Sequence, residues 1–137
     1  MLSTKTTRNN MKNSQCKPSK KLIFVSSRLR GDMENNMKLA ECLCRIVALK
    51  GHIPIAPHIY FTRFLDDRNS NERDLGLTSG LELLKLCEEM WVFSMDGISE
   101  GMQKELDFAK KIGKKIRYLG SLDEEHIDCS CKKKKEQ

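Results

Sequence analysis

Four short segments of this chain are expected to be strands: three apolar runs, at residues 22–25, 53–56 and 90–93, and a mixed segment at 115–119. Between the runs, apolar residues recur every three or four positions, the period of an amphipathic helix, over 33–50, about 72–87 and 99–112. Asp32 and Gly51 are expected to cap the first helix, and Gly113 to end the last. Alternating strands and helices predict an α/β fold: a three-layer open parallel sheet of about four to five strands, with helices on both faces, Rossmann-like or flavodoxin-like.

Residues 57–76 interrupt this alternation. We expect an irregular loop there, whose aromatic first half, 58–64, either forms a wall over a pocket, contacts a second copy, or folds back on its own core. Proline at position 54 indicates a strand start or an edge strand. Trp91 is expected in the core, and the helix over 72–87 is expected to turn four leucines inward: Leu75, Leu83, Leu84 and Leu86.

Length, charge and hydropathy indicate one globular domain, at 21–120, between two polar tails. The net charge is +6, and residues 1–20 hold five basic residues and no acid. We expect 1–20 to be a disordered, solvated basic tail rather than a nucleic-acid arm, and 121–137 to be a loose charged tail. No apolar run approaches the length of a membrane span, and no secretory h-region follows the N-terminus. The expected compartment is the cytoplasm, without a membrane partner.

The six cysteines do not predict a metal site. Cys42 and Cys44 lie two apart in a helical pattern, and Cys129 and Cys131 form a single C-x-C. A pair of C-x2-C motifs, the strong zinc signal, is missing from the sequence. The glycine patterns of dinucleotide sites and P-loops are missing as well. We expect no bound metal and no cofactor.

Three loops are expected to converge on one edge of the sheet, because the carboxyl ends of parallel strands meet there. They are residues 26–32, 56–64 and 94–101. Hydroxyl, guanidinium and helix-start groups in these loops suit a phosphate or carboxylate. The candidate ligand-binding residues are Ser26, Ser27, Arg28, Arg30, Gly31, His58, Ser99, Gly101 and Met102.

Glu105 is the candidate catalytic residue. It follows the predicted helix start at Ser99 by one and a half turns and precedes the apolar positions Leu106, Phe108, Ala109 and Ile112. A carboxylate between an anion site and an apolar floor is a candidate nucleophile or base. The alternative is an ordinary glutamate on a surface helix, and His58 is likewise either structural or functional.

The three loops together resemble the nucleoside 2-deoxyribosyltransferase-like superfamily, and most closely a phage and bacterial branch known as a domain of unknown function. The matching pieces are FVSSRLRGD at 24–32, GHIPIAPHIY at 51–60 and CEEMWVFSMDGISEGMQKE at 87–105, within a resemblance that covers 21–119. The resemblance implies a nucleoside, nucleotide or nucleotide-derived ligand and a homo-oligomer whose neighbour completes the pocket. It implies that Glu105 attacks the anomeric carbon, that Ser99 and Gly101 contact the 5′ end, and that Arg30 and Gly31 cradle phosphate.

Two positions depart from the superfamily pattern. Phe24 stands where the enzymes have a tyrosine, and Gly80 stands where they have the aspartate that helps protonate the leaving base. Asp74, Glu72 or His58 would have to replace that aspartate. Two functions therefore stay open: cleavage or transfer of an N-glycosidic bond with a glutamate nucleophile, and a non-catalytic nucleotide-binding module, either a sensor or a sponge.

Overall fold

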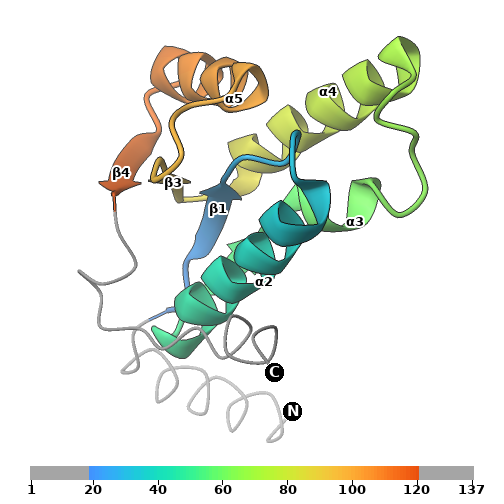
Figure 1. Ribbon diagram of the computed structural model, residues 1–137. Coiled ribbons are helices and arrows are strands. Elements are labelled where there is room, and N and C mark those ends of the chain that lie inside the picture. Colours follow the sequence, from blue (N-terminus) through green and yellow to red (C-terminus); the bar gives the residue numbers. More distant parts are fainter. Residues whose placement is uncertain (1–18, 121–137) are drawn as a thin grey trace, which may run out of the picture.

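Four parallel strands form one sheet in the order β2-β1-β3-β4 (Figure 1). The computed structural model describes residues 19–120, so the two predicted tails lie almost wholly outside the described residues. The strands are β1 (Leu22–Ser26), β2 (Ile53–Ile55), β3 (Glu89–Phe93) and β4 (Lys115–Leu119). All four lie where the sequence predicted them, and β2, which carries Pro54, is an edge strand.

The helices are α2 (Met33–Leu49), α3 (Pro57–Phe61), α4 (Ser70–Leu86) and α5 (Glu100–Lys111). Side chains cap three of them: Asp32 caps α2, Asn69 caps α4 and Ser99 caps α5. The expectation of an irregular segment over 57–76 was wrong in two places. Pro57 begins a short helix, since a proline suits the first helical position. Asn69 accepts hydrogen bonds from two backbone amides, which starts α4 at Ser70 rather than at residue 72.

The core has two halves, one on each face of the sheet, because successive side chains of a strand point to opposite faces. On one face α2 packs over the sheet, and the buried side chains there include Ile23, Val25, Leu43, Ile46, Val47 and Trp91. On the other face α4 and α5 pack, and the buried side chains include Phe24, Leu84, Met90, Val92, Met102 and Leu106. Figure 1 shows α2 on one side of β1 and the pair α4 and α5 on the other. The predicted three-layer α/β fold is confirmed.

Three apolar positions do not face the core as the sequence predicted. Leu75 is 55% exposed and Leu86 is 68% exposed, whereas Leu84 is fully buried. At about 100° per residue, both exposed leucines lie on roughly the opposite side of α4 from Leu84. Ile112 is also exposed, because it follows the last turn of α5. No helix in the described part of the chain is both long and apolar enough to span a membrane.

Candidate functional site

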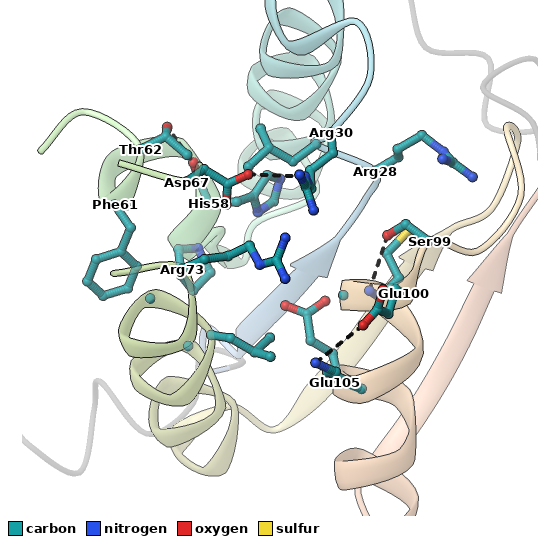
Figure 2. Close-up of a pocket in the computed structure, with 18 of the residues that line it drawn as sticks. Arg28, Arg30, His58, Phe61, Thr62, Asp67, Arg73, Ser99, Glu100 and Glu105 are labelled. Carbon is teal, nitrogen blue, oxygen red and sulfur yellow. Dashed lines mark hydrogen bonds and ion pairs between the residues drawn. The ribbon is translucent and has the colours of Figure 1, made fainter. Parts of the chain in front are cut away.

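A pocket of about 580 Å³ opens at the carboxyl edge of the sheet (Figure 2). All three predicted loops contribute to its lining, together with α4 and the first turns of α5. The predicted site residues that line it are Ser27, Arg28, Arg30, Gly31, His58, Ser99, Gly101, Met102 and Glu105. Ser26 belongs to the same site because its hydroxyl binds Glu105.

Glu105 lies at the floor of this pocket, on the second turn of α5, and its carboxylate points into the cavity (Figure 2). Ser26 Oγ donates a hydrogen bond of 2.7 Å to Glu105 Oε1. Burial raises the pKa of Glu105 from its usual value to about 7, and the bond from Ser26 opposes this rise. Glu105 therefore divides between its protonated and ionised forms near neutral pH, which suits a nucleophile or an acid–base group.

The start of α5 fixes where Glu105 lies. Gly97 adopts a positive φ of 86° in the turn after β3, and Ser99 Oγ then accepts a hydrogen bond of 3.2 Å from the amide of Met102. Met102 and Leu106 turn into the core. Glu105 follows Met102 by three residues, so it lies at the edge of the buried stripe, facing the end of β1. Met102 thus serves the core and the helix cap as well as the pocket lining.

Ser27, the residue after Ser26, contacts a second titratable side chain, that of His58. Ser27 Oγ lies 3.1 Å from His58 Nε2, on α3. Burial lowers the pKa of His58 to about 4, so its imidazole is neutral at pH 7. Ser26 and Ser27 therefore fix a glutamate and a neutral histidine at the same pocket, from adjacent positions at the end of β1.

The two arginines of the first loop each have a partner within the protein, and their contact with a phosphate stays a prediction. Arg28 Nη2 donates to the carbonyl oxygen of Asp96 at 3.1 Å, and its guanidinium points away from the centre of the pocket (Figure 2). Arg30 Nε pairs with Asp67 Oδ2 at 3.3 Å. The N-terminus of α2 is already capped by the Asp32 carboxylate, whereas Ser99, which caps α5, is neutral. An anionic ligand is therefore better accommodated at α5 than at α2.

Sequence reasoning missed the wall that α4 contributes. This wall comprises Arg73, Gly76, Leu77 and Gly80. Successive members are three, one and three residues apart, which places all four on one face of the helix. This spacing was the signal in the sequence that could have predicted the wall. Figure 2 shows the Arg73 guanidinium pointing into the pocket, toward Glu105.

The two acids proposed to replace the missing aspartate differ in position. Glu72 lines the pocket, but its Oε1 accepts a hydrogen bond of 3.1 Å from the amide of Asp66. Asp74 is exposed and does not line the pocket. Gly80 is buried against Pro57, so a Cβ added there would lie 3.7 Å from the proline ring carbon Cβ. Neither acid therefore takes the place that Gly80 leaves without a side chain.

The aromatic segment after β2 divides between two environments. Phe61 lines the pocket and packs against both Tyr60 and Phe64, with ring centroids 4.6 Å and 5.7 Å apart. Tyr60 and Phe64 are exposed. One aromatic ring thus forms part of the expected pocket wall, and the role of the other two in contact with a second copy stays a prediction.

Metal-binding chemistry is not evident between residues 19 and 120. No group of three or more histidine, cysteine, aspartate or glutamate side chains gathers there in a way that could hold an ion. Burial raises the pKa of Cys44 and of Cys87 to about 11, so both remain protonated thiols at neutral pH.

Comparison with known families finds a match over residues 21–119, to the family described as a domain of unknown function (DUF7768). The match spans the whole sheet and every residue of the pocket. No curated protein matches the chain significantly.

Proposed function

We propose that this chain, which belongs to the DUF7768 family, cleaves or transfers the N-glycosidic bond of a nucleoside or nucleotide, with Glu105 as the nucleophile. The observation that carries the proposal is the Glu105 carboxylate itself. It is half-buried at the floor of a pocket of about 580 Å³, it accepts a hydrogen bond from Ser26, and desolvation there raises its pKa to about 7. The pocket volume lies within the range of about 300–1,000 Å³ typical of small-molecule sites. The resemblance of the three loops to nucleoside 2-deoxyribosyltransferases supports the same reaction.

The chemistry proceeds in two displacements. Ser26 binds Oε1 of Glu105, which leaves Oε2 to attack the anomeric carbon. The carbon–nitrogen bond breaks, its electron pair departs with the base, and a glycosyl ester forms on Glu105. Water or an acceptor then attacks the anomeric carbon, and the Glu105 carboxylate is released. The negative charge also stabilises the oxocarbenium-like transition state.

The 5′ end of the ligand is assigned to the first turn of α5. The first amides of a helix have no partner within the helix, and they favour an anion. Ser99 caps this turn, and Gly101 leaves open space beside the backbone. This placement puts the sugar between the start of α5 and the Glu105 carboxylate.

The second candidate is a nucleotide-binding module without turnover. Gly80 supplies no acid, and His58 is neutral at pH 7 because burial lowers its pKa to about 4. Loss of a general acid commonly reduces the rate by about 10² to 10⁴. A pocket that keeps its anion-binding helix start but lacks this acid also suits a sensor or a sponge.

A panel of nucleosides, nucleoside monophosphates and dinucleotides tests the two candidates. The purified chain is incubated with each compound, free base is measured by liquid chromatography, and retained ligand is measured by mass spectrometry. Glu105→Gln is compared with Glu41→Gln, which changes an exposed glutamate on α2 outside the pocket. Base release that disappears only in Glu105→Gln supports the enzyme. Retained nucleotide without base release supports the binding module, and base release at the full rate by Glu105→Gln refutes the nucleophile.

A further inference from the structure

The wall of the pocket opposite Glu105 is built by charged side chains from three separate segments. Arg30 comes from the loop after β1, Asp67 from the link between α3 and α4, and Glu72 and Arg73 from the first turns of α4. In Figure 2 the guanidinium groups of Arg30 and Arg73 lie on the side of the cavity that faces the Glu105 carboxylate. We call these four residues the charged wall.

Three of the four charged side chains in this wall have a partner within the protein, and Arg73 has no ion-pair partner among the described residues. Asp67 Oδ2 pairs with Arg30 Nε at 3.3 Å, and Glu72 Oε1 accepts from the backbone amide of Asp66 at 3.1 Å. Within residues 19–120, no carboxylate lies within ion-pair distance of the Arg73 guanidinium. Both acids of the wall are thus engaged, while Arg73 offers its donors to the cavity.

The Arg73 guanidinium in the pocket affects which kind of leaving group can depart from the anomeric carbon of the ligand. An arginine stays protonated at all physiological pH values, so it cannot donate a proton to a departing base. It does bind a carboxylate or phosphoryl group through two parallel hydrogen bonds, and it stabilises negative charge that develops on a leaving group. Gly80 stands where an acid would assist a neutral base, and Arg73 lies on the same face of α4, about two turns nearer the start of the helix.

We propose that the leaving group of the ligand is anionic: a base or other aglycone that carries a carboxylate or phosphoryl group, which Arg73 binds directly. The inference rests on the proposed function, because it assigns the opposite end of the ligand from the one held by α5. It names the substrate class as glycosides whose aglycone departs as an anion without prior protonation.

The step balances without a general acid. Glu105 Oε2 forms a bond to the anomeric carbon, and the glycosidic bond breaks with its electron pair on the aglycone. The aglycone leaves with one additional negative charge, which Arg73 offsets, and it takes its proton from water after it leaves the site. Water then cleaves the glycosyl ester and restores the Glu105 carboxylate.

A pair of nucleotides that differ by one carboxylate tests the inference. Orotidine 5′-monophosphate and uridine 5′-monophosphate share the sugar, the phosphate and the pyrimidine ring, and only the first carries a carboxylate on the base. Calorimetric titration of Glu105→Gln, which cannot turn them over, measures both dissociation constants. We expect the carboxylated nucleotide to bind about tenfold to hundredfold more tightly, the usual effect of a hydrogen-bonded charge pair.

Two further variants in the same Glu105→Gln background assign the effect. Arg73→Gln is expected to bring the ratio of the two dissociation constants close to one, whereas Arg63→Gln, an exposed arginine outside the pocket, is expected to preserve it. Arg73 is exposed on the surface of α4, so its replacement leaves the core intact. Equal affinity for the two nucleotides in the Glu105→Gln protein overturns the inference.

A third outcome separates the base end of the ligand from the phosphate end. If Arg73→Gln weakens both nucleotides equally and the ratio persists, Arg73 holds the 5′-phosphate and the inference is overturned. Orotidine without its phosphate confirms the assignment if it loses affinity in Arg73→Gln by the same factor as its monophosphate. Release of neutral bases by the wild-type chain, with equal affinity for both probes, overturns the inference and leaves the proposed function standing. The proposed function fails with it only if no compound of the wider panel is cleaved.

Discussion

Replacing Ser26 by alanine should raise the pH at which Glu105 ionises. The Ser26 hydroxyl donates to Oε1 at 2.7 Å, and this bond holds the pKa of Glu105 below the value that burial alone would give. A hydrogen bond to a charged acceptor contributes about 1.5–3 kcal/mol, and one pH unit corresponds to about 1.4 kcal/mol. We therefore expect Ser26→Ala to move the titration of Glu105 upward by about one to two pH units from its wild-type value of about 7.

The measurement does not depend on knowing the substrate. Glutamate is labelled with ¹³C at its side-chain carboxyl carbon, and the chemical shift is followed by NMR from pH 4 to pH 10, a range set by about three units on either side of pH 7. The Glu105 signal is assigned by its loss in Glu105→Gln. Ser79→Ala is the matched control, because Ser79 lies on α4 outside the Glu105 pocket.

Two results would refute the reasoning. One is a wild-type Glu105 that titrates near 4.5, the ordinary glutamate value, which would mean that burial does not act on this carboxyl. The other is an unchanged midpoint in Ser26→Ala. If a substrate is in hand, the ionised fraction at pH 7 should fall roughly fivefold or more, and the rate of base release with it.

Three other substitutions give outcomes that can be measured separately. Glu105→Gln should stabilise the fold by about 3 kcal/mol at pH 8 and by little near pH 4.5, because Glu105 keeps its proton up to a higher pH in the folded state than in the unfolded state. Urea unfolding at both pH values measures the free energy of unfolding, and an equal gain at both would contradict this prediction. Gly80→Asp should raise the rate at which neutral bases are released by about tenfold or more, since the new side chain places an acid beside Pro57 on the pocket wall. An unchanged rate in the chromatographic assay would show that the missing acid does not limit the reaction. Gly97→Ala should lower the free energy of unfolding by about 1 kcal/mol, because the φ of Gly97 is +86°. Gly101→Ala should not lower it, because Gly101 lies in a helical turn with open space around it. Equal losses of stability in thermal unfolding of the two variants would contradict the backbone argument.

The sequence predicted the strands and the helices α2 and α5 because the signals for each lie within its own residues or directly before them. The four predicted strand segments and the caps Asp32 and Ser99 are local features, and the structure confirms their places. The helix α3 has only five residues, too few to show a helical period, and it depends on Pro57 at its start and on ring contacts of Phe61. Leu75 and Leu86 were misplaced because α4 is amphipathic over a narrow stripe around Leu84, which a list of apolar residues does not reveal.

The pocket residues that come from the three loops and the start of α5 were predictable from the sequence, whereas the wall from α4 and the contacts within the site were not. Convergence of loops at one edge of a parallel sheet brought Glu105 and His58 to the same pocket. The hydrogen bond from Ser26 to Glu105 spans 79 residues, and no local pattern encodes it. Arg73 was missed because it comes from a helix wall rather than from a loop after a strand, and the pairing of Arg30 with Asp67 depends on where the link before α4 folds back.

The edges of the sheet constrain how this protein can associate with itself. At one edge β2 has three residues, and Pro54 at its centre has no N–H to donate. At the other edge β4 carries two exposed basic side chains, Lys115 and Arg117. Short strands, prolines and charges at an edge oppose the addition of another strand. Neither edge of the described sheet therefore favours a sheet that continues from one molecule into the next.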